Sequence, residues 1–335
     1  MPHLAILRST LKRGAIVAAA NWPVVVIQFV AESTFKLLLG IPIVGGAVLV
    51  ALALGRDLRA LLGGDLRDIV TDVLAALAGQ PGALAAFVVA VVIVLAGGSA
   101  LMFLVKGGTV TVLVAGDAAA GAIERPPVRL AAVARAGQYS VDRFVLGAST
   151  LFRRYLRLGL ALFAVYLLSG GAYLVAVFGT RSLVGGTAGT LGWTVLAALC
   201  SSALLVWITI VNLVYLLIQM IVALEDCGVR RAVVHLGRFL RLRLREVFLV
   251  FVVVLALVVV ATAASLLATT GLSLISFIPL IGLAVFPLQA AAWLVRGLVF
   301  QYLGLTALGA YISQYRGAGT GGAEPPGPGL PRTAS

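Results

Sequence analysis

The sequence predicts an all-α fold, a polytopic transmembrane helical bundle of about six spans with interfacial amphipathic helices on its cytoplasmic side. Hydrophobic residues make up 61% of the chain and charged residues only 11%, whereas soluble domains average about 45–50% and about 25%. Several apolar runs reach the roughly 20 residues that a helix needs to cross a bilayer. Lysine and arginine are concentrated in alternate segments between these runs, which is typical of polytopic membrane proteins.

Six apolar runs can hold a membrane crossing. They lie within residues 18–55, 83–105, 158–178, 190–212, 247–269 and 275–295. Six crossings place both termini on the same side of the membrane. We therefore expect residues 1–316 to form a single integral membrane domain. Residues 317–335 are rich in glycine and proline, a composition that predicts a disordered tail.

The distribution of basic residues predicts the orientation of these crossings. The N-terminal segment and the gaps 106–157 and 225–246 carry most of the arginines, whereas the alternate gaps carry few, or dilute them with aspartates as in 56–72. Basic segments remain in the cytoplasm, so we expect both termini to be cytoplasmic and the protein to lie in the cell (inner) membrane. The formal charge of +13 follows from this pattern. No basic groove with interleaved aromatic residues accompanies it, so we expect no nucleic-acid partner.

The six spans can be grouped into three similar helical hairpins. Each unit opens with a basic amphipathic stretch, at about 4–17, 128–157 and 228–246, and continues through a crossing, an outer loop and a longer second crossing. Repeated supersecondary units of this kind predict a threefold hairpin repeat. The alternative is that any six-span protein obeying the charge rule alternates in this way.

The stretch 228–246 is the clearest amphipathic segment. On a helix, Val229, Ala232, Val233, Leu236, Phe239, Leu240 and Leu244 gather on one side, as expected for a helix at a membrane surface. The opposite side carries five arginines that are candidate contacts for anionic lipids: Arg230, Arg231, Arg238, Arg241 and Arg245. The alternative is that this helix only anchors the fifth crossing.

Polar residues within the apolar runs form a second candidate site. Glu32 and Lys36 are four residues apart, a spacing that favours an ion pair on one helix face. If the first crossing begins early in its run, this pair is buried in the membrane, where ionisable groups are candidates for solute binding or proton transfer. If the crossing begins near residue 37, the pair lies at the cytoplasmic interface. Asn212 and Gln289 raise the same possibility more weakly, because amides in helical bundles usually bond a neighbouring helix.

The inventory of reactive side chains argues against catalysis. The two histidines, His3 and His235, have no second histidine, cysteine or carboxylate at the spacing of metal ligands. No phosphate-binding, dinucleotide-binding or hydrolase motif is present. We therefore expect no catalytic residues, no metal, no cofactor and no enzyme activity.

One region resembles a known group of proteins. The run Ile221–Gly228 (IVALEDCG), followed by Ala232, by Arg238, Phe239 and Leu240, and then by an apolar crossing, is similar to the junction in uncharacterised bacterial six-span families. Those families are related to the membrane domain attached to some glycerophosphodiester phosphodiesterases. The resemblance implies a six-span layout and a bacterial origin. The phosphodiesterase acid and base of those enzymes belong to a separate soluble domain that this chain lacks, so the resemblance implies no active site here.

The sequence thus favours a lipid-interacting structural or accessory component of the inner membrane, with anionic lipids of the cytoplasmic leaflet as its partners. The alternative is a transporter or channel-like carrier of a small solute that uses Glu32 and Lys36. The sequence indicates no protein partner, oligomeric state or transported solute.

Overall fold

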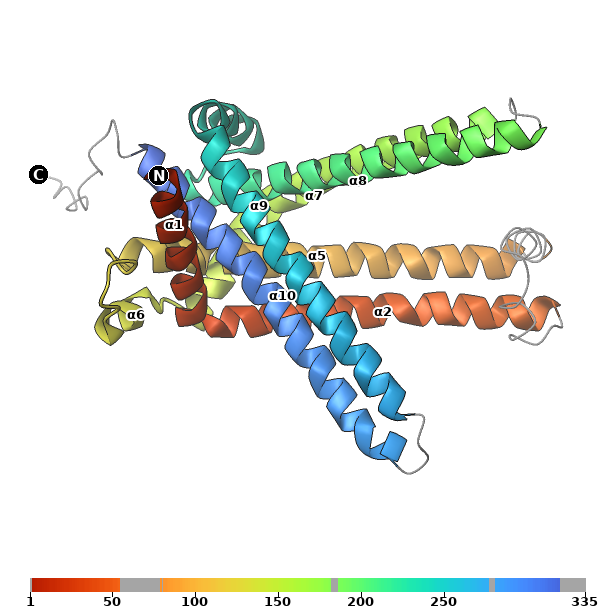
Figure 1. The fold of residues 1–335 in the computed structure, drawn as a ribbon, viewed down its shortest axis with the longest axis horizontal. Coiled ribbons are helices and arrows are strands. Elements are labelled where there is room, and N and C mark those ends of the chain that lie inside the picture. Colours follow the sequence, from red (N-terminus) through yellow and green to blue (C-terminus); the bar gives the residue numbers. More distant parts are fainter. Residues whose placement is uncertain (1, 55–78, 80, 182–185, 277–280, 320–335) are drawn as a thin grey trace, which may run out of the picture. The chain divides into compact units, whose positions relative to one another are not determined.

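The computed structural model describes residues 2–54, 79, 81–181, 186–276 and 281–319, and these residues form helices and connecting turns without a strand. The all-α fold class is therefore confirmed (Figure 1). The helices are α1 (Pro2–Ala20), α2 (Trp22–Leu54), α5 (Pro81–Ala119), α6 (Leu130–Ala136), α7 (Val141–Arg181), α8 (Gly186–Leu224), α9 (Val229–Ser276) and α10 (Ile281–Gly319).

Six of the described helices are long and apolar enough to cross a membrane, as the sequence predicted. The candidate spans are Trp22–Pro42, Leu84–Ala119, Val141–Thr180, Gly189–Leu224, Val229–Leu272 and Pro287–Gly319. The predicted range 275–295 begins in the last turn of α9 and passes over residues 277–280, which lie outside the described residues, before α10 begins at Ile281. Residues 317–319 of the predicted tail are the last residues of α10, and the rest of the tail lies outside the described residues.

The first predicted range, 18–55, contains a break at Asn21 between α1 and α2. Pro23, in the first turn of α2, has no backbone N–H and its ring clashes with a preceding helical carbonyl, which ends α1. The buried side-chain amide of Asn21 then forms hydrogen bonds with α1 and with the chain at the end of α6. Its Nδ2 donates to the carbonyls of Val17 (2.9 Å) and Ala136 (2.8 Å), and its Oδ1 accepts from the backbone N–H of Gln138 (2.8 Å).

The helices divide into two compact units. The larger unit comprises Met1–Val26 and Gly107–Ser335, and the smaller unit comprises Ile27–Lys106. In the smaller unit α2 packs against α5, and the ring of Phe35 lies so close to Gly98 that a Cβ there would be 2.0 Å from it. In the larger unit α7 and α8 form one hairpin and α9 and α10 form another.

The α7–α8 hairpin is antiparallel (Figure 1). Polar side chains contact one another across the hairpin. Tyr173 and Ser201 share a hydrogen bond of 2.8 Å, and Trp207 Nε1 donates to Ser169 Oγ over 2.8 Å. Hydrogen bonds between transmembrane helices add stability because lipid supplies no competing partners. Consecutive helices thus pair as hairpins, as predicted, while the proposed sequence repeat among them stays a prediction.

The buried core of the larger unit lies at one end of its hairpins. The largest fully buried side chains come from the ends of α5, α7, α8 and α10 and include Tyr155, Tyr311, Leu113, Leu217, Met220 and Ile221. Farther along the hairpins, large apolar side chains are exposed, with Leu168 and Leu267 each at 75%. Apolar surface of this extent on long apolar helices is suited to contact with lipid rather than water.

α1 and α10 cross at unusually close range in the larger unit. A Cβ on Gly14 would lie 2.4 Å from the carbonyl oxygen of Thr306 and 2.7 Å from the backbone nitrogen of Ala310. Next to this contact, the hydroxyl of Tyr302 donates to the carbonyl of Ala15 over 3.0 Å. The absence of a side chain at Gly14 is therefore what allows the two backbones to meet.

We expect Gly14→Ala to lower the stability of the protein. In an exposed helix interior the same change should be favourable by about 1 kcal/mol, because alanine has the higher helix propensity. Gly237→Ala in α9, where nothing lies within 4 Å of the added Cβ, is the matched control. The measurement is the thermal unfolding midpoint of each variant in detergent. Equal midpoints for the two variants would show that α1 and α10 do not pack in this way.

Candidate functional site

A cluster of two arginines and two carboxylates joins four parts of the larger unit. Arg13 comes from α1, Asp117 from the end of α5, Glu124 from the segment after α5, and Arg316 from the end of α10. Arg13 Nε lies 2.6 Å from Asp117 Oδ1, and Arg316 Nη1 lies 2.8 Å from Asp117 Oδ2. Arg13 also binds Glu124, with Nη1 and Oε2 3.0 Å apart. We call these four residues the arginine–carboxylate cluster.

Asp117 is the centre of this cluster. Its side chain is only 2% exposed, and each of its carboxylate oxygens is bound by a different arginine. The carboxylate lies at the C-terminal end of α5, where the helix dipole disfavours a negative charge. The two guanidinium groups offset both this unfavourable position and the loss of hydration.

The cluster also satisfies backbone carbonyls at the end of α5. Arg13 Nη2 donates to the carbonyl of Asp117 over 2.8 Å, and Arg316 Nη2 donates to that of Val114 over 3.1 Å. Burial opposes the positive charge of Arg13, but its bonds to Asp117 and then to Glu124 outweigh burial and raise the pKa of the guanidinium. Arg13 therefore stays charged, and the cluster acts as an electrostatic clamp between helices rather than as a proton carrier.

A second set of contacts lies at the α8–α9 junction. The hydroxyl of Tyr315, next to Arg316 on α10, donates to Glu225 Oε1 over 3.0 Å. The ring of Phe239 packs edge-on against Tyr315 with centroids 5.2 Å apart, and Arg154 of α7 pairs with Asp226. Glu225, Tyr315 and the arginine–carboxylate cluster therefore lie at the same end of the larger unit, which we call the charged end.

Cys227 belongs to the same junction, and its surroundings raise the pKa of its thiol. Partial burial raises the pKa of the thiol, and the negative charge of Glu225 raises it further, whereas Arg154 and Arg231 act weakly in the opposite direction. A raised pKa means less thiolate at neutral pH, and the thiolate is the nucleophile. Cys227 is therefore unsuited to covalent catalysis.

Most of the basic segment predicted at residues 228–246 lies in α9, and its residues 229–242 form the first part of that helix. A non-helical backbone at Arg243 (φ −131°, ψ 20°) separates it from the rest of that helix, and Arg243 Nη1 binds both carboxylate oxygens of Glu246 over 2.6 and 2.8 Å. Of its predicted apolar side, Ala232, Leu236 and Phe239 are buried in the protein, while Val233 and Leu244 are exposed. The five predicted lipid contacts are all exposed: Arg230, Arg231, Arg238, Arg241 and Arg245.

Three further arginines surround a cavity near the arginine–carboxylate cluster. Arg125, Arg129 and Arg135 line a space of about 280 Å³ in the segment between α5 and α6. Sequence reasoning grouped these arginines only as an orientation signal. A small cavity with three cationic groups has the electrostatic character of an anion site.

In the smaller unit, Glu32 and Lys36 form the predicted i,i+4 ion pair, with Oε1 and Nζ 2.5 Å apart. Their side chains are 32% and 68% exposed, respectively. Lys106 of α5 also interacts electrostatically with Glu32, a neighbour that sequence reasoning did not assign to the pair. Among the described residues of the smaller unit, these three charged groups therefore lie on two candidate spans.

Asn212 and Gln289, the weaker polar candidates, belong to the larger unit, and their role in an intramembrane site stays a prediction. The amide oxygen of Asn212 accepts a hydrogen bond of 2.6 Å from the hydroxyl of Tyr166, which links α8 to α7. Gln289 lies half-buried on α10. Within the described residues no group of three or more histidine, cysteine or acidic side chains is placed to hold a metal.

The six apolar helices define a multi-pass helical membrane protein, and most of the charged residues described in its larger unit lie at one end. No protein-family model matches the chain, and no curated protein or solved structure matches it. The functional argument therefore depends on the residues and contacts described above.

We expect Asp117→Asn to destabilise the protein by about 3–5 kcal/mol, because it leaves two partly buried arginines without their shared counter-charge. The free energy of unfolding can be measured by equilibrium unfolding in mixed micelles. Asp226→Asn is the matched control, since Asp226 is 86% exposed in its pair with Arg154 and such pairs contribute about 0–1 kcal/mol. A loss for Asp117→Asn no larger than that of the control would contradict the clamp.

Proposed function

We propose that this chain is a non-enzymatic, lipid-interacting accessory protein of the inner membrane that binds anionic lipids at its charged end. The observation that supports this most is the exposure of five of the six arginines of residues 230–245 while the buried side chains Ala232, Leu236 and Phe239 hold the same segment against the protein. Arginines on a rigid support lose little conformational entropy when they bind phosphate groups.

The proposed orientation of the protein in the membrane follows from the distribution of its basic residues. The charged end carries the basic segments of the sequence, and such segments remain on the cytoplasmic side. The cytoplasmic leaflet is rich in anionic lipids, and each nearby basic residue contributes about 1 kcal/mol of attraction. The cavity lined by Arg125, Arg129 and Arg135 adds a second group of cations at the end of α5. We also propose that the resemblance of residues 221–240 to six-span bacterial families reflects a true relationship, which is compatible with a membrane accessory role.

We expect reversal of charge at three arginines, Arg238→Glu, Arg241→Glu and Arg245→Glu, to lower anionic-lipid binding about tenfold or more, since three attractions of about 1 kcal/mol each become repulsions. Native mass spectrometry of the purified protein, titrated with phosphatidylglycerol, measures this binding. The matched control replaces the same three residues with lysine, which preserves the charge. Equal binding by the glutamate variant and the unchanged protein would contradict the proposal.

A second candidate function, solute transport, is favoured by one observation. Glu32 and Lys36 pair within the candidate span Trp22–Pro42, and Lys106 lies on the neighbouring span. Ionisable groups at membrane depth are candidates for solute or proton pathways. This function requires water to reach Glu32 and Lys36 inside the membrane.

Cysteine accessibility distinguishes the two functions. Single cysteines at positions 28, 32, 36, 40 and 44, in a variant without Cys200 and Cys227, are labelled in sealed vesicles by a membrane-impermeant maleimide. The lipid-interacting function predicts labelling at 28 and 32 from the cytoplasmic side and protection beyond 36. Labelling at 32 and 36 with protection at both 28 and 44 would instead indicate a wet intramembrane site and support transport.

A further inference from the structure

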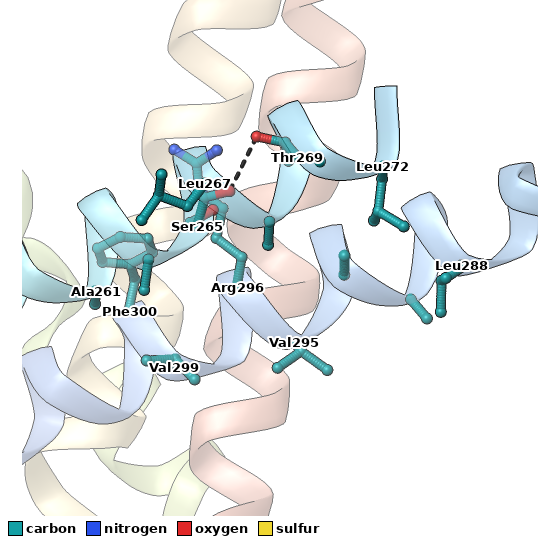
Figure 2. A pocket seen from close by; sticks show the side chains of 15 residues that line it. Ala261, Ser265, Leu267, Thr269, Leu272, Leu288, Val295, Arg296, Val299 and Phe300 are labelled. Atoms are coloured by element: carbon teal, nitrogen blue, oxygen red, sulfur yellow. Dashed lines mark hydrogen bonds between the residues drawn. The ribbon is translucent and has the colours of Figure 1, made fainter. Parts of the chain in front are cut away.

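The second half of α9 and the first half of α10 enclose a groove of about 800 Å³ (Figure 2). Small side chains leave this space open between the two helices, including Ala261, Ala264, Ala268, Gly271, Ala291 and Ala292. Larger apolar side chains such as Leu272 and Leu288 form its edges. Both helices are candidate spans, and the hydrocarbon chain of an amphiphile can fill such an apolar surface without a desolvation penalty.

One charged side chain lines this apolar groove. Arg296 of α10 extends towards the turn of α9 that carries Ser265 and Leu267 (Figure 2). Its guanidinium carbon lies 5.7 Å from the centre of the Phe300 ring, a weakly stabilising cation–π distance. No carboxylate of the described part of the chain pairs with Arg296, whose side chain is exposed on the helix pair.

The position of Arg296 along the hairpin places it at membrane depth. It lies 15 residues after Ile281, the first residue of α10, and 18 residues before Gln314, or about 22 Å and about 27 Å along a helix. Gln314 marks the level of the charged end, because its Nε2 donates to the carbonyl of Glu246 over 3.4 Å. Residues 297–315 and 281–295 carry no charge, so Arg296 is an isolated cation between two uncharged stretches of helix.

An unpaired arginine at this depth is unfavourable by several kcal/mol unless it gains a counter-ion or reaches polar groups. A lipid phosphate supplies that counter-ion and matches the planar fork of the guanidinium. The hydroxyl of Ser265 lies on the groove wall and can donate a further hydrogen bond to the phosphate, while the acyl chain covers the alanine-lined surface.

From the groove and its single cation we infer that α9 and α10 form a binding site for one anionic phospholipid, with the headgroup phosphate at Arg296 and an acyl chain along the groove. This site is separate from the five arginines of the charged end. It goes beyond the proposed function, since it selects a lipid within the membrane-spanning hairpin rather than at the surface of a leaflet.

The test uses the full-length protein in vesicles that contain phosphatidylglycerol or phosphatidylcholine with a photoreactive diazirine in the acyl chain. After irradiation, peptide mapping locates the attached lipid. We expect phosphatidylglycerol to label the peptides that contain residues 261–272 and 288–300 several-fold more than phosphatidylcholine does. Arg296→Gln removes this preference, whereas Arg296→Lys retains part of it.

Two further variants make the result decisive. Ala268→Phe fills the groove without changing the charge and should lower labelling by both lipids, which tests the site even if Arg296→Gln does not fold. Arg245→Gln at the charged end should leave labelling in the groove unchanged, so this inference and the proposed function can fail separately. Equal labelling by the two lipids in the unchanged protein, or full preference in Arg296→Gln, would overturn the inference.

Discussion

The larger unit depends on a single buried carboxylate. Asp117 ends α5, and its two oxygens bind Arg13 of α1 and Arg316 of α10, residues that are 104 and 199 positions away in the sequence. A buried carboxylate at a helix C-terminus is stable only with such partners. Asp117 therefore holds the middle of α1 and the C-terminal end of α10 against the end of α5, and the crossing of α1 and α10 at Gly14 follows the same arrangement.

The packing of the rest of the unit reflects the absence of a hydrophobic driving force between helices inside a bilayer. Lipid chains are as apolar as leucine, so burial of apolar surface does not hold transmembrane helices together, and packing and polar contacts must do so. The buried side chains accordingly lie at the charged end, and the hairpins beyond it expose leucines such as Leu168 and Leu267. Because buried side chains hold the charged end together, the arginines of the basic segment face outward from a rigid support.

The sequence predicted the features that have a local or periodic signal. Apolar runs of sufficient length predicted six spans, and the 3.6-residue period of 228–246 predicted the exposed arginines. The pair Glu32 and Lys36 was predictable from its i,i+4 spacing. Asp117, Arg13 and Arg316 were not assigned to one another, because contacts between distant segments leave no periodic trace. Leu236 and Phe239 are buried by the protein. A helix face buried by lipid has the same apolar periodicity as one buried by protein, so the sequence could not distinguish the two.

The central claim of this account is that the charged end of the larger unit faces the cytoplasm while the far ends of its hairpins lie across the membrane. The most direct measurement labels single cysteines at Arg231, in the basic segment, and at Thr190, near the opposite end of α8, with an impermeant maleimide in sealed vesicles of known orientation. The account predicts cytoplasmic labelling at 231 and external labelling at 190. Labelling of both positions from the same side, or external labelling at 231, would contradict it.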